Sequence, residues 1–180
     1  MFYKLNIYLL VAVLFAVSAT SAKSQEKSIS ASNGVTVSVT EDSFAERFEF
    51  TAPTLEWELE NGDKIVAIVA AIKEPKKRVP PFITGFIAYE DDWRRYSKAI
   101  FRGGDEVNFE SVSRDVLTCS SRPCTLVESF NINLTPAQIE RHKKNNELVM
   151  QVRGGASSNF LISIPVDYLE AVQEFYDDKK

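Results

Sequence analysis

Residues 55–72 read LEWELENGDKIVAIVAAI, and they set the expected secondary structure of this 180-residue chain. Over residues 55–60, apolar side chains alternate with three glutamates, a period of two that is typical of a strand with one buried and one solvated face. Asn61-Gly62 is a strong hairpin signal, because both central residues of the tight turn take positive φ. The nearly all-apolar return over residues 64–72 predicts a central strand. The three glutamates are expected on a solvated face, with a site for a cation or a basic partner as the alternative.

The same alternation recurs along most of the chain. Strands are expected over residues 35–40, 48–50, 82–89, 105–117, 125–134, 148–152 and 160–164, most of which show this alternation at least in part. Eight or nine strands joined mostly by short links predict a mainly β protein, an antiparallel β-sandwich that is immunoglobulin-like in general shape. The alternative is an α+β domain with one large curved sheet. Residues 35–180 are expected to form one domain, in agreement with the length of the chain.

Two helices are predicted among the strands. The segment Thr135–Gln138 reads as a capping box with proline at the first helical position, so a short polar helix is expected to run to about Asn145. A second helix is expected from Pro165 to about Tyr176, because its apolar residues recur at spacings of three or four. This amphipathic C-terminal helix should dock on the sandwich, and the functional alternative is a helix that binds a partner.

The N-terminus has the organisation of a secretory signal peptide. Residues 1–4 carry one lysine, residues 5–17 are almost all apolar, and residues 18–22 are small. The apolar run is shorter than the roughly 20 residues of a membrane span, although an uncleaved anchor is the alternative. We expect cleavage after Ala22, or alternatively after Ala19, and therefore an exported protein, periplasmic or secreted, without stable membrane insertion.

The polar, serine-rich stretch that follows, residues 23–34, is predicted to be a flexible leader.

The chain contains two cysteines, Cys119 and Cys124, on either side of a short loop between two predicted strands. In an exported protein such a pair is expected to form a disulfide, which here would act as a clasp on the strand register. Four intervening residues do not fit a thioredoxin-like redox pair, whose cysteines are separated by two. Zinc needs four ligands, and the chain has one histidine, so no metal site is expected.

The composition excludes several classes of function. With 44% hydrophobic residues, 26% charged residues and a net charge of −4, the chain is neither collagen-like, wholly disordered nor a strong nucleic-acid binder. It has no glycine-rich phosphate loop and no dinucleotide fingerprint, so no cofactor is expected. The lone His142 lies among Arg141, Lys143 and Lys144 on a polar helix, which argues against a catalytic triad.

Two segments are candidates for ligand binding. The loop over residues 73–81 holds three prolines and several basic residues, and its Lys76, Lys77 and Arg78 could clamp an anionic group, although a solvated connection is the simpler interpretation. Trp93 and Tyr96 are three residues apart, which predicts one helical turn over residues 90–98 with both rings on the core. The alternative is that Trp93 and Arg94 contact a ligand.

Glu128 is a candidate buried carboxylate. In a regular strand from Leu126 to Leu134 it shares the inward parity of Phe130 and Ile132. A buried carboxylate requires a partner such as arginine, or its pKa rises. The alternatives are a structural ion pair, or a bulge beside Cys124 that turns Glu128 outward.

These observations favour an exported, non-enzymatic binding or accessory module of the cell envelope or extracellular space, whose partner is a protein or a cell-surface ligand. Two alternatives remain. One is a carboxylate-dependent hydrolase of envelope polysaccharide, which needs two suitably placed acids. The other is a secreted effector or inhibitor that binds a partner protein.

Overall fold

The computed structural model describes residues 24–119, 123–155 and 158–178. Within these ranges the chain forms a mainly β, antiparallel fold with one short and one C-terminal helix, as predicted. The strands are β1 (Gln25–Ser30), β2 (Thr36–Asp42), β3 (Arg47–Thr51), β4 (Leu55–Glu58), β5 (Lys64–Lys73), β6 (Arg78–Glu90), β7 (Lys98–Phe101), β8 (Glu106–Thr118), β9 (Thr125–Asn133), β10 (Glu147–Arg153) and β11 (Asn159–Pro165). The helices are α1 (Pro136–His142) and α2 (Val166–Asp178). The predicted signal peptide, residues 1–22, lies outside the described residues.

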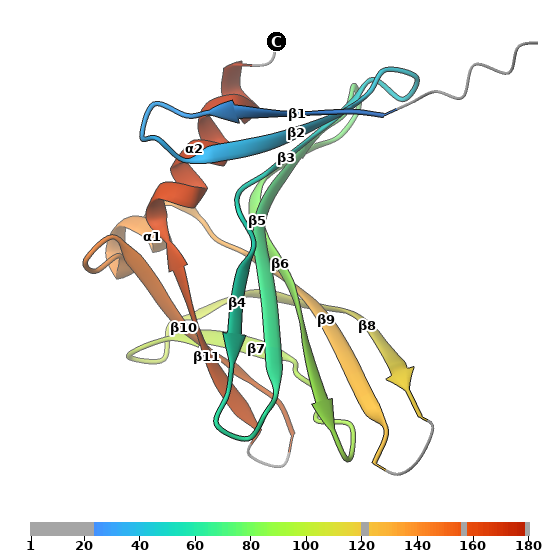
Figure 1. Ribbon diagram of the computed structural model, residues 1–180. Helices are drawn as coiled ribbons and strands as arrows, with labels where there is room; N and C mark the ends of the chain where they lie inside the picture. The colour runs from blue at the N-terminus through green and yellow to red at the C-terminus, as the bar shows by residue number, and fades with distance from the viewer. Residues whose placement is uncertain (1–23, 120–122, 156–157, 179–180) are drawn as a thin grey trace, which may run out of the picture.

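Hydrogen bonding joins the described strands into one sheet, in the order β1-β2-β3-β5-β6-β9-β8-β7-β10-β11, with β4 paired to β5. The predicted sandwich consists of two separate sheets, whereas here hydrogen bonding continues through all the described strands. The sandwich arrangement is not confirmed. The sheet changes direction along β8, where Glu106 and Val107 pair with β7 while residues 108–118 pair with β9. Figure 1 shows β5, β6 and β9 on one side of the lower part of the molecule and β7, β10 and β11 on the other.

The bent sheet encloses the hydrophobic core. The ring centroids of Phe130 on β9 and Phe160 on β11 are 6.2 Å apart, although these two strands are not hydrogen-bonded neighbours. The Tyr96 ring meets Phe160 edge to face at 5.0 Å. These contacts across the core hold the two parts of the sheet together, since each buried aromatic side chain contributes on the order of 2–3 kcal/mol through removal of apolar surface from water.

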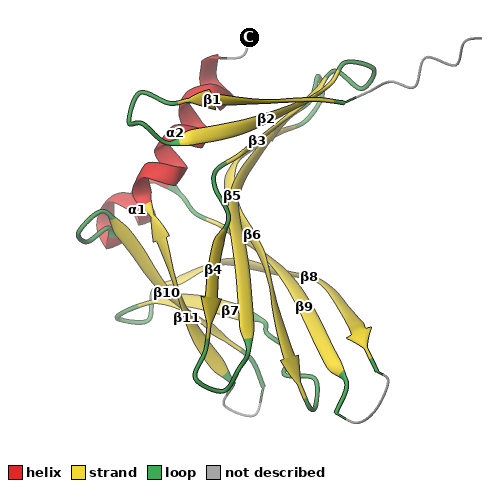
Figure 2. Cartoon of the chain, viewed as in Figure 1, coloured by secondary structure: helices red, strands yellow, loops and turns green. Residues whose placement is uncertain are grey.

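The upper part of the sheet is covered by α2. Its buried residues include Leu169, Ala171 and Val172, and the helix packs mainly against β5 and β6. Figure 2 shows α2, drawn in red, beside β1, β2 and β3. The predicted amphipathic pattern thus docks the helix on the sheet, and the Nζ of Lys73 donates a 2.8 Å hydrogen bond to the carbonyl of Tyr176.

Strand β1 lies in the stretch for which we expected a flexible leader. Residues 25–30 pair with β2 from Gln25 opposite Glu41 to Ser30 opposite Thr36. The difference arises because strand pairing uses backbone groups, which polar residues supply as well as apolar ones. The turn after β1 is also tied to α2, since the Oγ of Ser32 donates a 2.6 Å hydrogen bond to Glu174.

The hairpin predicted at Asn61-Gly62 is present, with β4 antiparallel to β5, but its turn is longer than expected. Gly62 has φ +85°, and the backbone N–H of Leu59 donates to the carbonyl of Asp63 at 2.9 Å. Glu56 and Glu58 are exposed, as the alternation predicts.

The proline segment differs from the predicted loop. β5 continues to Lys73, and β6 already begins at Arg78 and contains both Pro80 and Pro81. The two prolines occupy the irregularity where the pairing of β5 with β6 shifts register, and pairing with β9 starts only at Phe82. No ladder hydrogen bond is lost there, which is why a strand tolerates them.

Candidate functional site

The end of β9 nearest the disulfide buries a carboxylate among hydrogen-bond donors. Glu128 is 1% exposed, and its oxygens accept from the backbone N–H groups of Arg95 (2.8 Å) and Tyr96 (3.0 Å) and from the Nε of Arg114 (3.1 Å). The hydroxyl of Tyr89 donates to the same carboxylate. The bulges near the disulfide lie in β8, so β9 keeps its regular alternation and Glu128 points inward. Glu128 is thus both buried and ion-paired.

A second buried acid, Asp63, belongs to the same cluster. It is 4% exposed, and the guanidinium of Arg94 binds both of its carboxylate oxygens. That guanidinium also lies 4.3 Å from the centroid of the Tyr89 ring. Burial by itself would lower the pKa of Arg94, but the hydrogen bonds to Asp63 and Tyr96 outweigh it and raise the pKa.

The cluster holds the segment between β6 and β7 in place. The expected helical turn over residues 90–98 is not formed, because Asp91 (φ 84°) and Arg95 (φ 53°) have positive φ and the amide groups of residues 94–96 donate to side chains. Burial raises the pKa of both Tyr89 and Tyr96, so both phenols stay protonated. The hydroxyl of Tyr89 donates to Glu128, whereas that of Tyr96 accepts from Arg94. Among the described residues no buried side-chain polar atom lacks a hydrogen-bond partner, which indicates a structural role for this cluster.

The residues expected to bind a ligand are not brought together. Trp93 lies at the surface with 37% exposure, whereas the neighbouring Arg94 is committed to Asp63. Lys76, Lys77 and Arg78 lie at the opposite end of β6, which at about 3.3 Å per residue places them roughly 40 Å along the strand from Trp93. These two segments therefore do not form one site.

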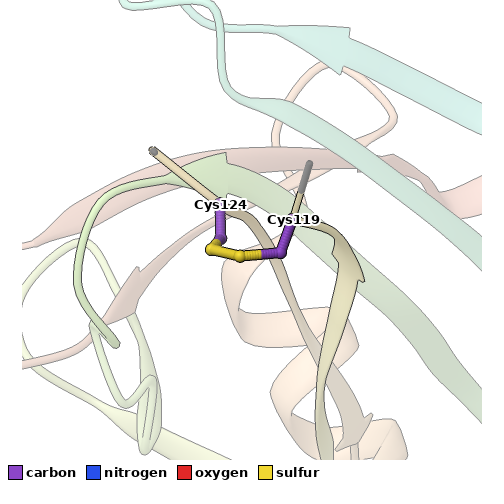
Figure 3. The surroundings of a disulfide bond; sticks show 2 residues. All are labelled: Cys119 and Cys124. Carbon is purple, nitrogen blue, oxygen red and sulfur yellow. A yellow bond between two sulfur atoms is a disulfide. The ribbon is translucent and has the colours of Figure 1, made fainter. Parts of the chain in front are cut away.

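The predicted disulfide joins Cys119 and Cys124 where β8 ends and β9 begins, with a Cα–Cα distance of 4.4 Å. Figure 3 shows the bond bridging the two chain segments. Residues 120–122 of the intervening loop lie outside the described residues.

Chemistry at Glu128 is disfavoured by this arrangement. Four donors occupy its oxygens, and a general acid or base needs a free oxygen that substrate can reach. In the described part of the chain, no three His, Cys, Asp or Glu side chains are grouped so as to hold a metal ion. Neither α1 nor α2 has the length and hydropathy needed to span a bilayer.

A groove of about 670 Å³ lies between α1, α2 and the start of β6, and we call it the acidic groove. Its apolar wall is formed by Pro80, Pro81, Leu134, Pro136, Ile139, Val166 and Leu169. Its carboxylates are Glu140, Glu170, Glu174 and Asp177, and Gln173 lies among them. The α2 residues that line the groove recur mostly at spacings of three or four, so they share one face of the helix. This face adjoins the one that docks on the sheet.

The acidic groove is built from anchored elements. The capping box of Thr135 and Gln138 fixes the start of α1, as predicted, although α1 ends at His142 rather than near Asn145. Ser32 holds Glu174 through its backbone N–H and its hydroxyl. The Nζ of Lys143 lies 2.8 Å from the Oε1 of Glu140, one of the carboxylates of the groove.

The sequence predicted an amphipathic helix at the position of α2 but not the groove beside it. Its walls come from segments far apart in sequence, and no local pattern brings Pro80, Ile139 and Glu170 together. A partner such as arginine was expected for a buried Glu128, but which residue supplies it was not predicted, and the structure places Arg114 directly opposite it in the pairing of β8 with β9.

No family model matches this chain, and neither a curated protein nor a solved structure shows significant similarity to it.

Proposed function

We propose that this protein is an exported, non-enzymatic binding module that holds a cationic segment of a partner protein, bearing apolar side chains, in the acidic groove. One observation carries the proposal: an apolar wall and four carboxylates face the same groove, and Lys143 forms an ion pair with one of them, Glu140. Such a surface favours apolar side chains flanked by Lys or Arg. The apolar side chains would pack on the wall while the cations pair with the carboxylates.

The size and placement of the groove support this function. A volume of about 670 Å³ accommodates a few side chains, in the range of small-ligand pockets. α2 contributes to the groove along its length while the adjoining face of the helix packs on β5 and β6, so little order has to be gained on binding. The signal-like N-terminus and the disulfide support export, where such a partner would be met.

Binding of a soluble synthetic peptide rich in lysine and leucine tests the proposal. The double variant Glu170→Gln, Asp177→Asn removes two exposed carboxylates from the groove and should weaken binding about tenfold, with a weaker dependence on salt. The matched control, Glu56→Gln with Glu58→Gln, removes the same charge from the exposed side of β4.

Equal losses in the two double variants would mean that net charge alone attracts the peptide, and the proposal would then be wrong. A larger loss in the β4 variant would instead identify the glutamate stripe as the basic-partner site. A photoreactive residue at Gln173 extends the test to the native compartment, where it should cross-link to a Lys- or Arg-rich segment of one partner.

A further inference from the structure

The outer side of β7, β10 and β11 carries a second groove, of about 750 Å³, which we call the basic groove. It is bounded at one end by the turn between β7 and β8 and by the residues that follow α1. α1 thus lies between the two grooves, since its Glu140 lines the acidic groove and its His142 lines the basic one.

The floor of the basic groove is apolar where a solvent-facing strand surface is ordinarily polar. Val149 is 47% exposed and Leu161 is 58% exposed. They are diagonal neighbours on one face, because Val149 pairs with Ser163 and Leu161 with Gln151. The core is formed by the alternate residues of the same strands, so these two side chains contribute little to folding. Because these two exposed side chains adjoin each other inside a groove, they form a candidate contact surface for apolar groups of a ligand.

The polar groups around this floor are predominantly cationic. Arg102 and Lys144 have no ion-pair partner among the described residues, and the Nε of Arg153 donates a 2.7 Å hydrogen bond to Gln151. Glu147 is the one carboxylate among the lining residues, and it accepts a 2.9 Å hydrogen bond from the hydroxyl of Ser163. The unpaired cations favour a negatively charged occupant.

One end of the basic groove is held by contacts between α1 and the β7–β8 turn. The imidazole of His142 stacks on Phe101 with centroids 4.0 Å apart, and its Nε2 lies 2.7 Å from the Oδ2 of Asp105. The hydrogen bond with His142 lowers the pKa of Asp105. Arg102 lies in the β7–β8 turn and Lys144 follows α1, so the contacts of His142 fix the distance between these two cations before any ligand binds.

We infer that the basic groove is a second docking site, which takes an acidic segment of a partner protein bearing one or two apolar side chains. The apolar floor is an open patch of two large side chains, which suits such side chains better than a long acyl chain that requires enclosure. With oppositely charged grooves on the two sides of α1, the protein would bind one partner through acidic residues and another through basic residues. The second site stands on its own observations and does not require the acidic groove to be occupied.

The test uses a soluble synthetic peptide rich in glutamate and leucine, titrated against the folded protein. Two variants probe the site: Arg102→Gln with Lys144→Gln removes charge, and Val149→Ser with Leu161→Ser removes the apolar floor. Each should weaken binding about tenfold, because charge and apolar contact act together. The matched control, Lys76→Gln with Lys77→Gln, removes the same charge from the exposed basic turn and should bind as the wild type does.

Absence of binding, or equal loss in the control, would overturn the inference, as would a stronger affinity for anionic lipid vesicles than for the peptide. All six substituted residues are exposed, so each variant is expected to fold, and circular dichroism is the measurement that checks this. The lysine-leucine peptide separates the two proposals: it should bind the basic-groove variants as tightly as the wild type. Either site can therefore fail without changing the result for the other.

Discussion

Arg114 and Glu128 face each other across β8 and β9, and the Nε of Arg114 lies 3.1 Å from the Oε2 of Glu128. The carboxylate is buried, whereas the arginine side chain is 41% exposed. The same carboxylate binds two backbone amides of the segment that follows β6, Arg95 and Tyr96. One side chain therefore connects two neighbouring strands to the loop that packs Tyr96 into the core.

Glu128→Gln is expected to lower the free energy of unfolding by about 3 kcal/mol, because it breaks a buried ion pair. This is the lower end of the range for such pairs, since Arg114 remains in partial contact with water. The amide can replace one acceptor, but it introduces N–H donors where all neighbours are donors. Urea denaturation measures the effect. Glu110→Gln, an exposed change on β8, is the control and should be neutral. A Glu128→Gln variant as stable as the wild type would contradict the structural role of this carboxylate.

Gly154→Ala tests how closely the β6–β7 segment packs on the end of β10. A Cβ at Gly154 would lie 2.5 Å from the carbonyl oxygen of Arg94, so the backbone must move. We expect a loss of about 2 kcal/mol in unfolding free energy, as for other overpacked sites. At the adjacent Gly155 the same oxygen would be 3.4 Å away, an ordinary contact, so Gly155→Ala should cost much less. Similar losses in both variants would show that packing against Arg94 is not the cause.

Alkaline pH should destabilise the protein through Tyr89 and Tyr96, whose pKa values are raised by burial. Below pH about 10, the phenols are neutral in both folded and unfolded chains, and the stabilisation is complete. Above that pH the unfolded chain ionises first, so the free energy of unfolding falls as pH rises. Urea denaturation between about pH 9 and 11 should show this fall.

Tyr89→Phe should make the alkaline fall shallower, while costing about 1 kcal/mol at neutral pH for the lost hydrogen bonds. Tyr168→Phe on α2 serves as the control for aromatic substitution outside the cluster. An unchanged alkaline slope in Tyr89→Phe would exclude Tyr89 as its source.

Removal of the disulfide by Cys119→Ser and Cys124→Ser should loosen the end of the β8–β9 hairpin. The closed loop is short, so the chain-entropy model gives a stabilisation of about 2 kcal/mol. Hydrogen exchange should accelerate at residues 116–118 and 125–127, while the amides of β5 retain their protection. Faster exchange throughout the sheet would instead show that the disulfide stabilises the whole domain.

Much of the local structure was predictable because it depends on neighbouring residues. Alternation over residues 125–134 predicted β9 together with the inward parity of Glu128, and the residues of the capping box predicted the start of α1 at Pro136. The segment from Asp91 to Arg95 was not predictable in the same way. Its conformation depends on hydrogen bonds to the side chains of Tyr89 and Glu128. Glu128 is more than thirty residues away in the sequence, so no local pattern indicates this contact.

The amino-acid pattern alone was sufficient for most of the antiparallel strands, although not for β1, and for the two helices and the pairing of Cys119 with Cys124. Each of these depends on periodicity or on spacing within a few residues. The tertiary structure decided that β8 joins both parts of the molecule into one sheet, since strand pairing is made by backbone groups that every residue except proline can supply. It also decided the two grooves, whose charges and apolar walls come from segments that meet only after the chain has folded.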